Sequence, residues 1–70
     1  MHFKEIIATI KTRRKSLQVT QEEVSELSGV SLRTLKQFES SKGNLTMANL
    51  QKLCDTLGLE IKLTVKEIHR

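Results

Sequence analysis

The fold is decided by the stretch TQEEVSELSGVSLRTLKQF, residues 20–38. Thr20 and Glu23 have the spacing of a capping box, which predicts a helix that begins directly after Thr20. Gly29 can take the left-handed backbone conformation that a tight helix exit requires. Ser31 is a good N-cap for a second helix, which would end at about Ser40. These signals predict two short helices joined by a tight turn.

Apolar residues at helical spacing extend this pattern in both directions. Phe3, Ile6, Ile7 and Ile10 predict a helix from about residue 3 to residue 14 or 15. Thr46 caps a further helix that ends at about residue 57, before Gly58. The expected buried face of that helix consists of Met47, Leu50, Leu53, Cys54 and Leu57. The absence of proline also favours helices with short connections, so the predicted fold class is all-α, a compact bundle of four or five helices.

The eight residues that follow Gly58 have a different period. Leu59, Ile61, Leu63 and Val65 alternate with polar residues, which predicts a β-strand with one buried face. The sequence offers this strand no partner. Two tails that pair antiparallel about a two-fold axis would satisfy both backbones and form a homodimer. We therefore expect a domain over residues 1–58 and a dimerisation strand with its tail over residues 59–70; a frayed helix or a loose tail is the alternative.

Charge and side-chain placement favour a nucleic-acid partner. The formal net charge is +4 and the pI is about 9.6, which suits a polyanion. With two aromatic residues in the whole chain, a base-stacking platform for single strands is not expected. In the second helix of the quoted stretch, Leu35 and Phe38 form an inner stripe, whereas Arg33, Thr34 and Gln37 lie on the outer face. This layout lets one side of a helix pack on a core while the other lies in a DNA major groove.

Other classes of function lack the residues that they need. Cys54 is the single cysteine, so we expect a buried thiol in a reducing compartment and no intramolecular disulfide. His2 and His69 have no neighbours at metal-ligand spacing, and the isolated glycines form no phosphate-binding loop. No stretch approaches the ~20 apolar residues of a membrane span, and the N-terminus has no signal-peptide pattern. We expect a cytoplasmic protein that is not an enzyme and has no cofactor, no metal and no membrane partner.

Beyond these patterns, many spaced positions resemble one family. They are Gln21, Gly29, Val30, Ser31, Leu35, Glu39 and Leu57-Gly58-Leu59. Over residues 3–59 the chain resembles the lambda-repressor-like, Cro-type (XRE-like) helix-turn-helix DNA-binding domain. The resemblance implies a bundle of the predicted kind in the bacterial cytoplasm or nucleoid. It also implies sequence-specific binding of double-stranded DNA by a dimeric transcriptional regulator, a repressor that reads a near-palindromic operator.

The resemblance also implies roles for single residues. Base edges are expected to be read by Leu32, Arg33, Thr34 and Gln37. Phosphates are expected to be bound by Thr20, Gln21, Ser31, Lys36, Lys42, Asn44 and Thr46. Arg14 and Glu39 match a family ion pair between the first helix and the end of the recognition helix. Two positions depart from the family pattern: Ser25 replaces an alanine and needs a hydroxyl partner, and Leu45 replaces a proline.

The tail suggests a subfamily. Residues 59–65 look like the strand through which HipB-type antitoxins dimerise. Those proteins bind their own operator and neutralise a kinase toxin, although plain repressors can carry the same strand. The alternative function is therefore a HipB-like antitoxin that also binds a kinase-like toxin protein.

Overall fold

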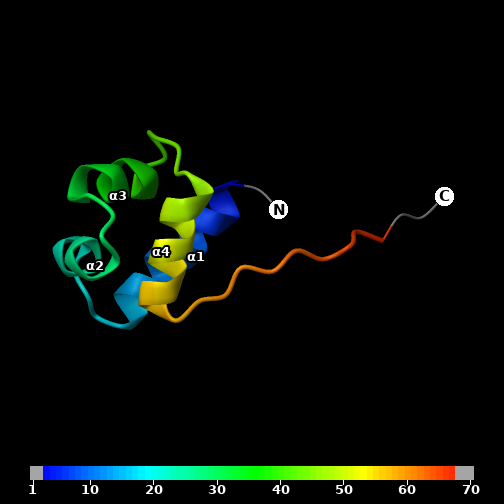
Figure 1. The fold of residues 1–70 in the computed structure, drawn as a ribbon, viewed down its shortest axis with the longest axis horizontal. Helices are drawn as coiled ribbons and strands as arrows, with labels where there is room; N and C mark the ends of the chain where they lie inside the picture. The colour runs from blue at the N-terminus through cyan, green and yellow to red at the C-terminus, as the bar shows by residue number, and fades with distance from the viewer. Residues whose placement is uncertain (1–2, 68–70) are drawn as a thin grey trace.

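The computed structural model describes residues 3–67 and contains four helices in that range. They are α1 (Phe3–Ser16), α2 (Gln21–Ser28), α3 (Leu32–Glu39) and α4 (Met47–Leu57) (Figure 1). The predicted all-α bundle is confirmed, with four helices and no β-strand among the described residues. None of these helices has the length and apolar character needed to cross a bilayer. The two histidines, His2 and His69, lie outside the described residues, as do the last three residues of the tail.

Three of the helices begin at the hydroxyl caps predicted from the sequence. At α2, the Thr20 hydroxyl accepts the backbone N–H of Glu23, and the Glu23 carboxylate accepts the backbone N–H of Thr20, both at 3.0 Å. Ser31 and Thr46 accept one backbone N–H each from the first turns of α3 and α4. Each cap satisfies a donor that the helix itself leaves free, and replacing such a residue by alanine costs about 1 kcal/mol.

Two helices end at glycines with a left-handed backbone. Gly29 has φ 81° after α2, and Gly58 has φ 69° after α4. At α2, the Gly29 N–H donates to the carbonyl of Ser25 at 3.0 Å. After α4, the N–H of Leu59 donates to the carbonyl of Cys54 at 2.8 Å. The chain can turn away from the helix axis at these two points because glycine carries no Cβ that would strain this conformation.

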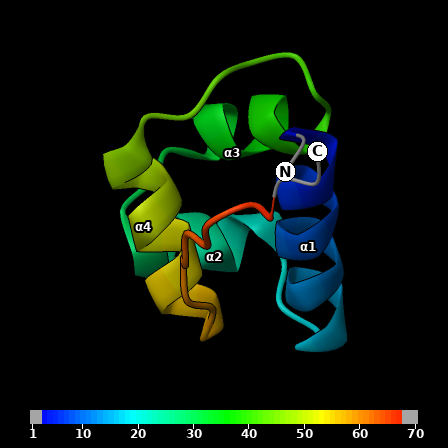
Figure 2. The ribbon, with the colours of Figure 1, turned by 90° about the vertical axis from the view of Figure 1, so that its right-hand side faces the viewer.

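All four helices contribute to one core. α1 and α4 lie side by side, and α2 and α3 pack against one side of this pair (Figures 1 and 2). The buried apolar residues are Ile10, Val24, Val30, Leu35, Phe38, Leu53, Cys54 and Leu57. Full burial of one such aliphatic or aromatic side chain stabilises the fold by about 1.5–3 kcal/mol. α3 is therefore fixed mainly by the two residues, Leu35 and Phe38, that it places in this core.

The tail leaves the bundle on the side opposite α2 and α3 (Figure 1). Leu59 and Ile61 are half-buried against the core, but Leu63 and Val65 are 96% and 98% exposed. The expected strand is not formed within residues 59–67, because β-pairing needs a second strand and the described chain supplies none. Pairing between two copies stays a prediction.

The expected burial of Met47 is wrong, because this side chain is 68% exposed. Met47 is the first residue of α4 and lines a groove between α1, α4 and the tail. The other four predicted positions on α4 follow the pattern: Leu53, Cys54 and Leu57 are buried and Leu50 is half-buried.

Candidate nucleic-acid interface

The candidate interface is centred on the outer face of α3. Leu35 and Phe38 lie in the core, whereas Arg33 and Gln37 are exposed. Residues four positions apart are neighbours on a helix surface, so Arg33 and Gln37 lie next to each other on the outer side. The helix therefore has one face that anchors it and another that offers a guanidinium and an amide to a partner.

The two other positions expected to face bases are less accessible. Leu32 and Thr34 are half-buried. The Thr34 hydroxyl accepts a hydrogen bond from the Ser31 hydroxyl at 2.8 Å, and the Thr34 backbone N–H donates to the same Ser31 oxygen. Thr34 is thus partly engaged in the cap of its own helix, which leaves Arg33 and Gln37 as the freest polar side chains of the four.

The turn between α2 and α3 is held by its own hydrogen bonds. Val30 is buried at the corner, with 1% of its surface exposed. Its carbonyl accepts the hydroxyl of Ser25 at 2.6 Å, and its N–H donates to the hydroxyl of Ser28 at 3.1 Å. Ser25, which replaces the family's alanine, therefore has the partner that its hydroxyl needs, and it fixes the angle at which the chain enters α3.

The residues expected to bind phosphates sit at helix starts and in the α3–α4 loop. Thr20, Ser31 and Thr46 precede α2, α3 and α4, where unpaired N–H groups favour anions. The other exposed members are Lys36 on α3, and Lys42 and Asn44 in the loop. Within residues 3–67, Lys36, Lys42 and Arg33 take part in no ion pair. Their charges are therefore available to an external anion.

The single carboxylate of α3, Glu39, is turned inward and paired. Arg14 of α1 donates to both of its oxygens at 2.8 Å, from Nε to Oε2 and from Nη2 to Oε1. The side chains are only 12% and 3% exposed, and the hydrogen bond with Glu39 raises the pKa of the Arg14 guanidinium, against the effect of its burial. The outer face of α3 consequently carries cations without an opposing carboxylate of its own.

Gln21 joins this buried pair to the start of α2. Its amide Nε2 donates to Glu39 Oε1 at 3.2 Å, and Arg14 Nη1 donates to the carbonyl of Val19 at 3.0 Å. The structure thus pairs Arg14 with Glu39, as the family resemblance implies, and places Gln21 against the same carboxylate. Because an amide nitrogen carries two hydrogens, Gln21 keeps a second donor for a phosphate while its first holds the end of α3.

Sequence reasoning missed the role of Arg13. Arg13 lies in the basic last turn of α1, and its Nε donates to the carbonyl of Leu57, the last residue of α4, at 2.8 Å. Cations stabilise helix C-termini, and this one bridges two helices. No local signal distinguishes such a long-range cap from an exposed arginine. Among the described residues, no three His, Cys, Asp or Glu side chains are grouped so that they could hold a metal ion.

Comparison with known proteins agrees with this geometry. A family model described as "Helix-turn-helix" matches residues 10–63. The cryptic phage CTXphi transcriptional repressor RstR of Vibrio cholerae serotype O1 (strain ATCC 39315 / El Tor Inaba N16961) is 38% identical over 61 residues, 87% of this chain. Those residues make up 52% of RstR, so the chain spans about half the length of this relative. With most of its helical bundle inside the matched range, the chain belongs to the helix-turn-helix family of DNA-binding transcription regulators.

Proposed function

We propose that the protein binds a specific sequence of double-stranded DNA as a dimeric transcriptional repressor, with α3 in the major groove. The observation that carries this proposal is the two-sided α3, which buries Leu35 and Phe38 and exposes Arg33 and Gln37. The similarity to a phage transcriptional repressor supports the regulatory role.

Sequence discrimination comes from the outer face of α3. Arg33 can donate two parallel hydrogen bonds to O6 and N7 of guanine, and Gln37 can pair with N6 and N7 of adenine. Leu32 covers a thymine methyl from the N-terminal end of the helix. A good bidentate contact discriminates against a wrong base by about 1–3 kcal/mol. Thr34 contributes less, because it is half-buried and its hydroxyl oxygen already accepts the O–H of Ser31.

Affinity and register come from the phosphate contacts. The hydroxyls of Thr20 and Thr46, with the helix N-termini behind them, bind backbone phosphates on either side of α3. Ser31 joins them when its O–H turns from Thr34 to a phosphate. Lys36, Lys42 and Asn44 add contacts from α3 and the loop. These contacts carry no base preference, but they fix the orientation in which Arg33 and Gln37 meet the groove.

Dimerisation doubles the length of DNA that is read. Residues 1–58 form the DNA-binding domain, and residues 59–70 contain the strand that pairs with a second copy. A two-fold dimer places its two recognition helices about 34 Å apart, one turn of DNA, and so requires a near-palindromic operator. The tail can serve this purpose because it leaves the bundle away from α3 (Figure 1).

Selection of bound duplexes from a random pool tests the proposal. The expected product is a near-palindrome with half-sites about 10 base pairs apart. Arg33→Ala is then expected to relax preference at one or two positions of each half-site. Lys42→Ala is expected to weaken binding on all sequences and to reduce the slope of log affinity against log salt by about 1. Lys52→Ala is the matched control, since it removes the same charge from an exposed position of α4 outside the proposed contacts. Recovery of no consensus would refute the proposal.

The antitoxin alternative remains a separate prediction. It adds a kinase-like toxin to the DNA function and leaves the use of α3 unchanged. A gene for a kinase-like protein beside this one, and inhibition of its product by this chain, would support it.

A further inference from the structure

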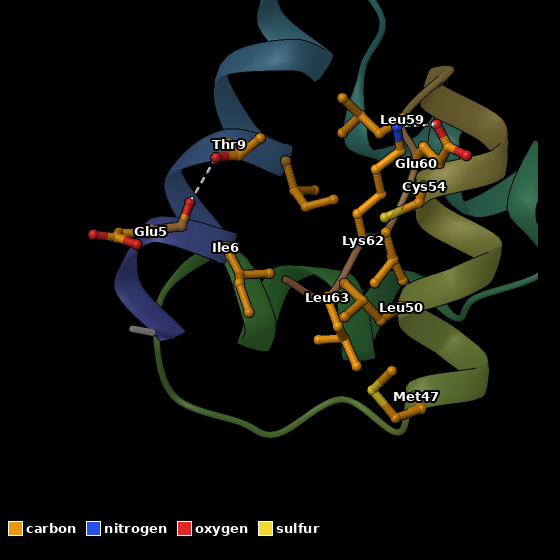
Figure 3. A pocket seen from close by; sticks show the side chains of 12 residues that line it. Glu5, Ile6, Thr9, Met47, Leu50, Cys54, Leu59, Glu60, Lys62 and Leu63 are labelled. Atoms are coloured by element: carbon orange, nitrogen blue, oxygen red, sulfur yellow. Dashed lines mark hydrogen bonds and ion pairs between the residues drawn. The ribbon is translucent and has the colours of Figure 1, made fainter. Parts of the chain in front are cut away.

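An apolar groove lies between α1, α4 and the tail, outside the DNA-binding face. It has a volume of about 480 Å³ and is lined by Ile6, Leu50, Leu59, Ile61 and other side chains (Figure 3). Met47 and Leu63 line it while remaining 68% and 96% exposed. Val65, just beyond, is 98% exposed. So much uncovered apolar surface in so small a domain indicates an occupant.

We propose that the occupant is the tail of a second copy, paired antiparallel with this tail in the register that places Leu63 on the two-fold axis. The proposal rests on the dimeric function proposed above and adds the register and the groove. Each register places a different set of side chains opposite one another, and these pairs distinguish the registers.

The registers compared have their two-fold axis at one of the residues 60–65, and three of them bring like charges together. Residues directly opposite in an antiparallel pair point to the same side, so apolar residues must face apolar residues. With the axis at Glu60, the two Glu60 side chains oppose each other, and with the axis at Lys62, the two Lys62 side chains do so. With the axis at Thr64, Lys62 opposes the partner's Lys66. Like charges directly opposite destabilise a strand pair, so these registers are disfavoured.

The registers with the axis at Ile61, Leu63 or Val65 avoid this repulsion, but the first and the last of them leave apolar residues unpaired. An axis at Val65 pairs only residues 64–66 within the alternating stretch. An axis at Ile61 pairs Glu60 with the partner's Lys62, but it sets Val65 opposite Leu57, which is buried in α4, and so leaves Val65 uncovered.

The axis at Leu63 pairs the whole stretch from residue 60 to residue 66. Glu60 then faces the partner's Lys66 twice, once on each side of the axis, and Lys62 faces the partner's Thr64. On the other side, Ile61 faces the partner's Val65 and the two Leu63 side chains face each other. Cross-strand Cβ atoms in such pairs are about 4.5–5.5 Å apart. The partner's Leu63 therefore reaches the groove that Leu63 lines together with Ile6 and Met47.

Charge reversal tests the register. Glu60→Lys and Lys66→Glu alone are each expected to weaken the dimer about tenfold, because two attractive pairs become repulsive. The double variant Glu60→Lys/Lys66→Glu is expected to restore the wild-type dissociation constant, measured by analytical ultracentrifugation. The matched control, Glu60→Lys/Lys62→Glu, is expected to stay weak. Restoration by the control instead would move the axis to Ile61 and overturn the proposal.

Cross-linking gives a second readout that does not depend on charge. In a Cys54→Ala background, single cysteines replace Ile61, Lys62 or Leu63, and each protein is oxidised with copper phenanthroline. Leu63→Cys is expected to form the disulfide-linked dimer at least about ten times faster than the other two, since only its Cβ atoms meet at the axis. A faster reaction at residue 61 or 62 refutes the register but leaves the dimer intact. A chain that stays monomeric refutes the dimer as well. The proposed role of α3 in DNA binding is tested separately by the selection of bound duplexes.

Discussion

Arg14→Met removes one partner of the buried ion pair and tests how α3 is held. The guanidinium makes two hydrogen bonds of 2.8 Å to Glu39 and one of 3.0 Å to the carbonyl of Val19. Without it, the 3%-exposed Glu39 keeps only the amide of Gln21 at 3.2 Å. Breaking a buried pair from one side costs about 3–5 kcal/mol, because the remaining charge has no compensation. A 70-residue domain has a total stability of about 3.5–10 kcal/mol, so the variant should be marginally folded.

Urea unfolding followed by circular dichroism at 222 nm measures this loss, since the chain has no tryptophan or tyrosine for fluorescence. The double variant Arg14→Met/Glu39→Leu is the control. It removes both charges, and replacing a buried pair by apolar residues of similar size is often neutral or stabilising. We therefore expect the double variant to be more stable than Arg14→Met alone. A loss below about 1 kcal/mol for Arg14→Met, the value typical of an exposed pair, would refute the reasoning.

Three further predictions follow from single positions. Gly29→Ala should cost about 1–2 kcal/mol in urea unfolding through its φ of 81° alone, since the added Cβ would meet no atom within 4 Å beyond its chain neighbours. Asparagine tolerates this conformation, so an equal loss for Gly29→Asn would contradict this explanation. Burial, with a smaller contribution from Asp55, raises the pKa of the Cys54 thiol in the folded state. The stability that the protonated thiol contributes is therefore complete below about pH 8.5 and is lost as the pH rises through the folded-state pKa. Between about pH 8.5 and 10, Cys54→Ala should therefore lose less stability than the wild type. Urea midpoints that fall by the same amount with pH in both proteins would contradict this. Gly43→Ala would place a Cβ 3.1 Å from the Cβ of Gln37, so we expect altered preference at the base that Gln37 is proposed to contact. Anisotropy on operator variants measures this preference, and an unchanged preference would argue against the proposed contact.

Local signals in the sequence were sufficient to predict where the helices begin and end. Thr20, Ser31 and Thr46 cap helices, and Gly29 and Gly58 end them, because capping depends on residues only a few positions apart. The inner face of α3 was equally predictable, since Leu35 and Phe38 are the apolar residues at helical spacing there. The pair of Arg14 with Glu39 came from the family resemblance, because no local pattern joins residues 25 positions apart.

The remaining features depend on how the helices are arranged in space. Arg13 and Arg14 are adjacent in the sequence, yet one bonds the end of α4 and the other the end of α3. Met47 has the spacing of a core residue but lines a surface groove and is largely exposed. The tail is a separate case, because alternation identifies a strand without identifying its partner, and that partner would belong to another molecule.

The shortness of α3 explains why specificity in this protein should depend on residues that contact no base. A helix of eight residues is not stable in water by itself, since isolated helices shorter than about 12–15 residues are marginal. The direction in which Arg33 and Gln37 point is therefore set by the cap at Ser31 and by the side chains that α3 buries. Glu39 fixes the far end through Arg14 and Gln21, and Gln21 also stands at the start of α2, where a phosphate would bind. Under the proposed function, the Glu39 carboxylate links a phosphate bound at Gln21 to the bases read by α3, because it is hydrogen-bonded to Gln21 and belongs to α3. Loss of this carboxylate should therefore weaken both the affinity for DNA and the preference for sequence.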